Sequence, residues 1–309
     1  MPLHPQVTEF LKIAQEAGAP RLYTLSPGAA RAQAAAMSEL IGAGPKVASV
    51  RDIEIPVRDT KLGGRVYEPE GSNATIVWFH GGGWVICDLD SHDAMCRILA
   101  NAAECTVIAV DYRLAPEHQF PVPLEDAWDA LNWVAEQYRS APLVLGGDSA
   151  GGNLTAVCAL RARDRGGPKI AVQVLVYPVT DYDMTRESYV VHGGEDMLLG
   201  KNEMVWFFDH YVPRPADRDN PEVSPLRAAD LSNLPAAIVV TDEYDPLRDE
   251  GLAYAQRLRE AGVPVTRYHL DDMIHGFFSF VNVFQTGNDT VERVGKAVRA
   301  AVAAAPVEH

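Results

Sequence analysis

The sequence has few cysteines and no long apolar run. Its 309 residues include four scattered cysteines that form no C-x-x-C pair, so we expect reduced thiols in the core rather than disulfides or a metal site. An H-E-x-x-H zinc motif is also absent. No stretch reaches the roughly 18 uninterrupted apolar residues of a membrane span. The N-terminus lacks the basic and apolar regions of a signal peptide, so we expect a cytoplasmic protein without a membrane anchor.

Positive charge is scarce as well. Lys and Arg total 27 against 42 Asp and Glu, which gives a formal net charge of -15 at pH 7. Nucleic acids and anionic membrane surfaces bind to basic protein faces, so neither is expected as a partner. The apolar content of 47% and the charged content of 22% are typical of a globular protein with a substantial core.

The first segment, residues 1–45, is predicted to be helical. Apolar residues recur at helical spacing in QVTEFLKIAQEAG, and Gly18 ends that helix. A second helix is expected from Ser26 as N-cap, with Pro27 at its first position, to near Gly42.

The pattern changes to that of an α/β protein after residue 45. VASVRDIEIPV and RVYEP indicate strands, which we expect at an antiparallel edge. Apolar runs such as TIVWF, TVIAV and PLVLGG then alternate with helical stretches, and this alternation predicts a parallel sheet covered on both faces. We therefore predict a mostly parallel central sheet of about eight strands, flanked by helices, built from residues 46–179 and 228–309.

One insertion, residues 180–227, interrupts this alternation. It contains the helical stretch KNEMVWFFDHYV but no strand. An insertion of this size between two strands usually lies over the carboxyl edge of the sheet, so we expect a helical cap formed together with residues 1–45. Trp206, Phe207 and Phe208 either line a pocket or pack the cap onto the body, and the sequence leaves both roles open.

A candidate nucleophile lies in LVLGGDSAGGNL, where GDSAG fits the G-x-S-x-G pattern of a strand–turn–helix elbow. The strand PLVLGG precedes Ser149 and a predicted helix follows it. Small neighbours are required because the serine of such an elbow adopts a strained backbone conformation. A glycine-rich loop without chemistry is the alternative, since the pentapeptide alone is not specific.

A nucleophilic serine needs a base to take its proton. Among nine histidines, His275 follows the last predicted strand, at the sheet edge where Ser149 also emerges. His269 lies within that strand and is expected to face a helix layer or the core. His80 is expected to brace its own loop rather than to act as the base.

The acid that orients the base is expected between Ser149 and His275 in the chain. The stretch AAIVVTDEYDPLRDE offers five acidic residues: Asp242, Glu243, Asp245, Asp249 and Glu250. The first two end a strand, and the last two are expected in the acidic first turn of a helix. Asp245 lies on the loop between them, where a short carboxylate can reach the histidine.

Negative charge on a tetrahedral intermediate must meet preorganised N–H donors. The motif HGGGW follows the strand TIVWF, and its glycines let the backbone approach a substrate closely. We expect the donors to be the amides of Gly82, Gly83 and Ala150. The residues expected to support this loop or to line the pocket are His80, Gly81, Trp84, Asp148, Trp206 and Phe207.

Five segments together resemble the hormone-sensitive lipase family of bacterial carboxylesterases. HGGGW, DYRLAPEHQFPVPLEDAW, GDSAGGNL, DEYDPLRDE and MIHGF look like the successive signature blocks of that family, between about residues 75 and 280. The resemblance implies an α/β-hydrolase fold, a Ser149–His275–Asp245 triad and hydrolysis of short- to medium-chain acyl esters. It also implies no cofactor and no metal, and it leaves open a homodimer formed through the last strand and neighbouring helices.

The sequence bears on three other functions. Plant gibberellin receptors resemble the family but lack the base histidine, so His275 argues against a non-catalytic receptor. Amidase or peptidase activity stays open, because the same triad attacks both kinds of carbonyl. The acidic composition disfavours a lipase that works at an oil interface. We expect activity to peak with acyl chains of about four to eight carbons, the size that a small-molecule pocket accepts.

Overall fold

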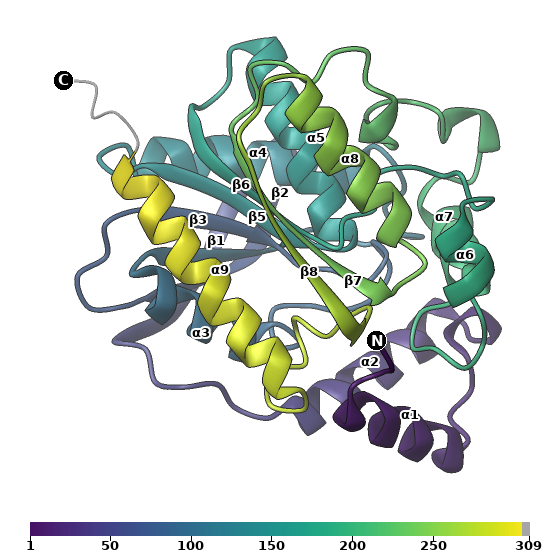
Figure 1. The fold of residues 1–309 in the computed structure, drawn as a ribbon. Coiled ribbons are helices and arrows are strands. Elements are labelled where there is room, and N and C mark those ends of the chain that lie inside the picture. The colour runs from purple at the N-terminus through teal and green to yellow at the C-terminus, as the bar shows by residue number, and fades with distance from the viewer. Residues whose placement is uncertain (305–309) are drawn as a thin grey trace.

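The computed structural model describes residues 1–304, and its centre is an eight-stranded sheet in the order β1-β2-β4-β3-β5-β6-β7-β8 (Figure 1). The strands are β1 (Ser49–Val57), β2 (Thr60–Glu68), β3 (Thr75–Phe79), β4 (Thr106–Asp111), β5 (Leu143–Asp148), β6 (Ile170–Val176), β7 (Ala236–Tyr244) and β8 (Val265–Ile274). The α-helices are α1 (Pro5–Ala17), α2 (Pro27–Ile41), α3 (Asp93–Ala103), α4 (Val122–Gln137), α5 (Ala150–Arg165), α6 (Glu187–His192), α7 (Lys201–Tyr211), α8 (Arg248–Glu260) and α9 (Gln285–Ala304). The short 3₁₀ turns are η1 (Leu22–Thr24), η2 (Pro215–Asp217) and η3 (Pro225–Arg227).

The sheet is mostly parallel, as predicted. Neighbouring strands from β4 to β8 in the sheet order pair in parallel. Among the described strands, β2 alone has the direction opposite to the other seven, and it pairs antiparallel with both β1 and β4. The two early strands therefore form the antiparallel edge that their sequence predicts.

Two helix layers cover the sheet. In Figure 1, α3 and α9 lie on one face and α4, α5 and α8 on the other. Side chains alternate accordingly along β3: Ile76 and Trp78 join the core cluster that contains α3 and α9, whereas Val77 and Phe79 join the cluster that contains α4 and α5. Every residue of β3 is buried, because a central parallel strand is covered on both faces.

The two predicted cap segments contact each other beyond the ends of β7 and β8 (Figure 1). Arg21, between α1 and η1, donates from Nε to the Glu203 carboxylate of α7 at 2.7 Å. The same guanidinium donates to the Met197 carbonyl oxygen at 2.7 Å. The insertion is anchored to the body by Asn153 of α5, whose amide donates to the carbonyl oxygens of Val179 and Val223. The N-terminal helices and the insertion thus meet over the same edge of the sheet.

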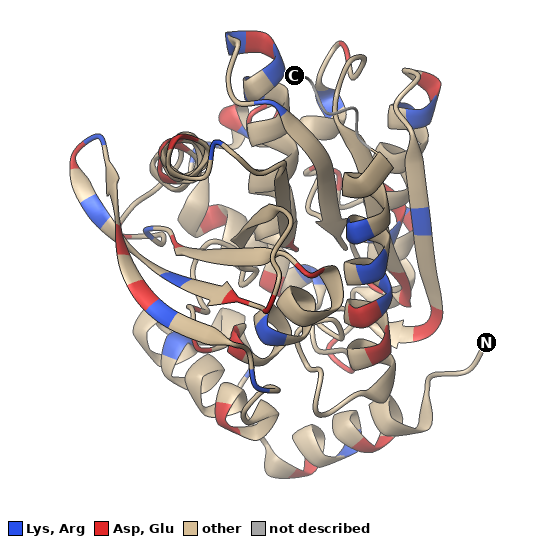
Figure 2. Ribbon diagram, turned by 90° about the vertical axis from the view of Figure 1, so that its left-hand side faces the viewer, with Lys and Arg blue, Asp and Glu red and all other residues tan. Residues whose placement is uncertain are grey.

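Acidic and basic residues are interspersed along the ribbon in Figure 2. On the β1–β2 hairpin, Lys61 pairs with Glu54 and Arg65 pairs with Asp52, each at 2.7 Å. The described part of the chain contains no helix with the length and apolarity needed to cross a bilayer.

Gly151 provides a test of the packing between α5 and the sheet. A Cβ at this position would lie 1.9 Å from the Phe79 carbonyl oxygen, so α5 would have to move away from β3. We expect Gly151→Ala to lower the free energy of unfolding by about 2–3 kcal/mol or more, measured by urea denaturation. Gly28→Ala is the matched control: it lies in α2 with open space around its Cβ and should be neutral or stabilising by up to about 1 kcal/mol. Equal stability of the two variants would contradict this account.

Candidate active site

Ser149 occupies a sharp turn between β5 and α5. Its backbone has φ 55° and ψ -117°, a conformation that L-residues rarely adopt. Its N–H donates to the Val176 carbonyl oxygen at 2.8 Å, and its own carbonyl oxygen accepts from the Val179 N–H at 3.2 Å. A Cβ on Gly147 would lie 2.4 Å from the backbone of Gly151. The turn therefore closes only because the residues two positions before and after Ser149 are glycines.

The structure brings His275 and Asp245 to this serine. His275 follows β8, and its Nε2 lies 3.0 Å from Ser149 Oγ. Its Nδ1 donates to Asp245 Oδ2 at 2.7 Å. The ring of Tyr177, which follows β6, packs against the imidazole with 4.4 Å between ring centroids. Three side chains that are far apart in the chain thus form one hydrogen-bonded series.

Asp245 is fully buried, and its Oδ1 accepts from the Leu247 N–H at 2.7 Å. Three of the other four acidic residues that the sequence offers have different partners. Glu243 pairs with Arg248 and His269, and Asp249 accepts from Ser188 and Arg248. Glu250 accepts from the Thr180 and Asp181 amides. Asp242 is buried without a hydrogen-bond donor.

The glycine loop after β3 presents free amides. Gly82 has φ 103° and Gly83 has φ 58°, which residues with side chains adopt only under strain. A Cβ on Gly82 would lie 2.3 Å from the Ile86 carbonyl oxygen, and one on Gly83 would overlap the Phe207 ring. Within residues 1–304, the amides of Gly82, Gly83 and Ala150 donate to no acceptor. Ala150 is the first residue of α5, where helix amides have no intrahelical partner.

His80 lies behind this loop rather than beside Ser149. Its Nδ1 donates to the Gly81 carbonyl oxygen at 2.7 Å, and its ring stacks on Tyr112 with 4.4 Å between centroids. The Tyr112 hydroxyl donates to the His80 carbonyl oxygen. Burial lowers the pKa of His80 to about 4, so the imidazole is neutral at pH 7. The contacts of His80 therefore stabilise the glycine loop and do not involve Ser149.

Asp148 joins the glycine loop to the serine turn. A Cβ on Gly81 would lie 2.4 Å from its carboxylate, which accepts from Trp78 Nε1 at 3.3 Å and lies 3.1 Å from His92 Nε2. Burial raises the pKa of Asp148, but the charge of His92 and its hydrogen bond outweigh burial, so the net pKa shift is downward. Sequence reasoning missed His92, which no motif marks.

The aromatic residues of the loop and insertion have distinct positions. Trp84 is fully buried and stacks on Tyr211 of α7 with 4.3 Å between centroids. Phe207 covers Gly83 and lines the cavity above the serine. Trp206 lies outside the cavity lining and packs against Phe207 and His210. Of the two roles left open for these aromatic residues, Phe207 lines the pocket, whereas Trp206 packs within the cap, because adjacent residues of α7 point to different sides.

A cavity of about 860 Å³ opens above Ser149 and His275. Gly82 and Gly83 lie at its floor, and α7 supplies Met204 and Phe207. The N-terminal helices contribute much of the remaining wall, which sequence reasoning did not assign to individual residues: Phe10, Leu11, Leu22, Met37 and Ile41. The predominantly apolar walls suit an uncharged organic substrate.

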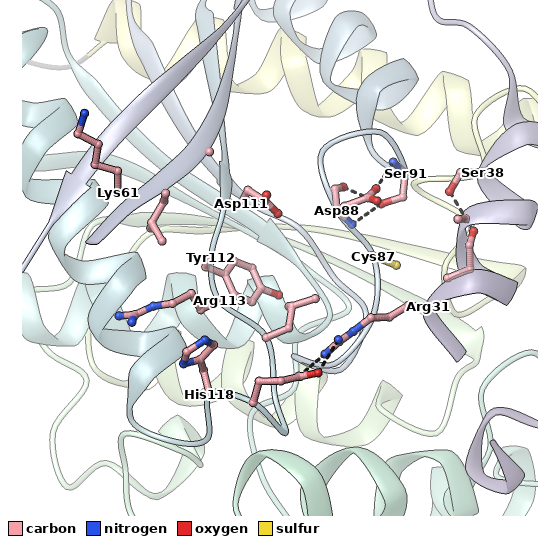
Figure 3. A pocket seen from close by; sticks show the side chains of 16 residues that line it. Arg31, Ser38, Lys61, Cys87, Asp88, Ser91, Asp111, Tyr112, Arg113 and His118 are labelled. Atoms are coloured by element: carbon pink, nitrogen blue, oxygen red, sulfur yellow. Dashed lines mark hydrogen bonds and ion pairs between the residues drawn. The ribbon is translucent and has the colours of Figure 1, made fainter. Parts of the chain in front are cut away.

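A second cavity of about 560 Å³ lies between α2 and the segments that contain residues 87–91 and 111–118 (Figure 3). Its rim carries the Arg31–Glu117 ion pair, and Asp88 and Asp111 also line it. Small residues, Ala34, Ser38, Cys87 and Ser91, line both cavities. The second space is thus separated from the first by short side chains and has a charged lining.

Comparisons with known proteins identify the family of the chain. A model of an alpha/beta hydrolase fold family matches residues 76–279. The carboxylic ester hydrolase LipN of Mycobacterium tuberculosis is 40% identical over 88% of this chain and 75% of its own length. An arylesterase of Saccharolobus solfataricus is 39% identical over 90% of this chain and 92% of its own length.

Solved structures give the same result. A hyperthermophilic esterase from the archaeon Pyrobaculum calidifontis superposes with a TM-score of 0.90 at 38% identity, covering 97% of this chain and 99% of its own. A thermostable esterase from Pseudomonas putida has a TM-score of 0.92 at 31% identity, covering 97% of this chain and 98% of its own. The chain is therefore a carboxylic ester hydrolase with the α/β-hydrolase fold, and it belongs to the hormone-sensitive lipase-type family.

Proposed function

We propose that the protein is a serine carboxylesterase that hydrolyses short- to medium-chain acyl esters through an acyl-enzyme on Ser149. The observation that carries the proposal is the continuous series of hydrogen bonds from Ser149 Oγ to His275 Nε2 and from His275 Nδ1 to Asp245, at 3.0 and 2.7 Å. These distances are within the range for proton transfer between a nucleophile and its base.

In the first half of the reaction, His275 accepts the Ser149 proton as Oγ attacks the ester carbonyl. Asp245 holds the imidazole in the tautomer whose Nε2 is free to accept, and stabilises the imidazolium that forms. The carbonyl oxygen becomes negatively charged and accepts hydrogen bonds from the Gly82, Gly83 and Ala150 amides. Because these donors are held by the backbone before substrate binds, little reorganisation is needed.

In the second half, the alcohol leaves with the proton from His275, and the acyl group remains on Ser149. His275 then takes a proton from water, which attacks the same carbonyl carbon and releases the acid. The amides serve both tetrahedral intermediates. Every proton transfer in the reaction therefore passes through His275, and water is the only co-reactant.

The cavity supports an ester of modest size. Its volume of about 860 Å³ lies within the range of about 300–1,000 Å³ for small-molecule pockets. The walls supplied by α1, α2 and α7 are largely apolar and close the space beyond the serine. We therefore propose acyl chains of about four to eight carbons as the preferred substrates, a size that such a pocket buries well.

Removing the nucleophile or the base tests the triad. Ser149→Ala and His275→Asn are each expected to lower kcat for p-nitrophenyl butyrate by about 10⁴-fold or more, with the fold retained by circular dichroism. His269→Asn is the matched control, since His269 lies on β8 but contacts Thr241 and Glu243 instead of the serine. Substantial activity in Ser149→Ala, or an equal loss in His269→Asn, would refute the assignment.

The size of the cavity predicts how a bulky wall residue changes specificity. Met37 of α2 lines the cavity, whereas Leu40 of the same helix is 70% exposed and does not. We expect Met37→Trp to lower kcat/KM for p-nitrophenyl octanoate by about tenfold, while the acetate ester changes less than twofold, because lost apolar burial affects the longer chain. Leu40→Trp should leave both values unchanged. An equal effect of Met37→Trp on both esters would contradict the predicted position of the substrate's acyl chain beside Met37.

A further inference from the structure

A second buried carboxyl group lies beside Asp245, and the reaction described above does not use it. Asp242 is near the end of β7, and its side chain is fully buried. Neither of its carboxyl oxygens has a hydrogen-bond donor in the described chain. A charged carboxylate in this position would be both desolvated and unpaired, which is strongly unfavourable.

The groups around Asp242 oppose its ionisation further. The Asp245 carboxylate interacts with Asp242 and repels a second negative charge. Glu243, the next residue of β7, adds negative charge. Tyr177, in the segment after β6, is a further titratable neighbour, and burial holds the pKa of its hydroxyl well above the usual range. On β8, the residue paired with Asp242 is the apolar Leu270. None of these groups is a cation.

Asp242 is therefore expected to keep its proton to a higher pH than an exposed aspartic acid. Burial, followed by the charge of Asp245, holds the pKa of Asp242 well above its usual range. Two carboxyl groups that share a buried site cannot both ionise readily, so one keeps a proton. Asp245 accepts hydrogen bonds from His275 Nδ1 and the Leu247 N–H, the kind of donors that Asp242 lacks.

We propose that Asp242 is a positioning residue for the ester hydrolysis: its carboxylic O–H donates a hydrogen bond to the Asp245 carboxylate and fixes that carboxylate toward His275. The inference rests on the proposed triad and extends it to a fourth group. The Asp242 proton stays on Asp242 throughout, and all transferred protons still pass between Ser149, His275, the alcohol and water. The extra donor also withdraws negative charge from Asp245, so that Asp245 binds the imidazolium less strongly.

The protonation of Asp242 is tested by stability, without any substrate. An unfolded chain releases this proton near pH 4, whereas the folded protein keeps it to higher pH. The stability of the wild-type protein relative to Asp242→Asn should therefore fall as pH rises above 4. The unfolding constant changes about tenfold for each pH unit, until Asp242 ionises in the folded state. Asparagine cannot ionise and escapes this loss.

Urea unfolding of both proteins between pH 5 and 9 measures this slope. Glu243→Gln is the matched control, because it removes a neighbouring carboxylate whose side chain is 34% exposed and should produce no comparable slope. A difference between wild type and Asp242→Asn that is independent of pH would overturn the proposal, since Asp242 would then be ionised in both states. Because no turnover is needed, failure of the proposed ester hydrolysis and failure of this inference are distinguishable.

The positioning role is tested by pH profiles of kcat and kcat/KM. Asp242→Leu removes the donor, and kcat should fall about tenfold with little change in KM, as for loss of a hydrogen bond to a charged group. The acidic limb of the Asp242→Leu pH profile should move to higher pH, because Asp245 then stabilises the His275 imidazolium more strongly. Asp242→Asn keeps an N–H donor, so its kcat should fall less than about threefold and its limb should stay in place.

Two outcomes would overturn the positioning role. One is an Asp242→Leu profile that superposes on the wild type, which would mean that the donor has no effect on Asp245. The other is an Asp242→Asn profile whose acidic limb moves to lower pH, as removal of a negative charge beside the triad would produce. If Asp242→Leu does not fold, Asp242→Ala removes the donor with less bulk, and the same comparison with Asp242→Asn applies.

Discussion

The active site depends on one strained turn, in which Ser149 stands at φ 55° at the end of β5. A residue held in this region is disfavoured by about 1–3 kcal/mol, so the surrounding structure has to impose it. Hydrogen bonds to Val176 and Val179 fix the turn on the neighbouring strand. Gly147 and Gly151 let β5, α5 and β3 approach more closely than any side chain would permit. Because of this backbone conformation, the Ser149 hydroxyl projects toward the cavity, where a base can reach it.

The parallel sheet brings the other groups to the same place. The glycine loop follows β3, Ser149 follows β5, Asp245 follows β7 and His275 follows β8. Because parallel strands end at one edge of the sheet, residues from four distant parts of the chain meet there. The N-terminal helices and the insertion then cover this edge, held together by the Arg21–Glu203 ion pair. Chemistry and substrate enclosure thus come from different parts of the chain.

Much of this arrangement could be predicted from the sequence, for identifiable reasons. Strand ends, the GDSAG turn and the order of serine, acid and histidine are local patterns, and the parallel topology relates them in space. The cavity walls from α1 and α2 could not be assigned, because they depend on a contact between Arg21 and the insertion. The sequence leaves open which of Trp206 and Phe207 lines the pocket, because neighbouring aromatic residues on a short helix give no periodic signal. The raised pKa of Asp242 depends on burial and on Asp245, which only the tertiary structure defines.

Covalent labelling with a p-nitrophenyl alkylphosphonate is the most direct test of the central claim that Ser149 is the nucleophile. The reagent resembles the tetrahedral intermediate and attaches covalently to an activated serine. The account predicts one adduct per chain, located by peptide mass spectrometry on Ser149, with complete loss of esterase activity. A fully inhibited enzyme whose Ser149 is unmodified, or an adduct on another residue, would contradict it.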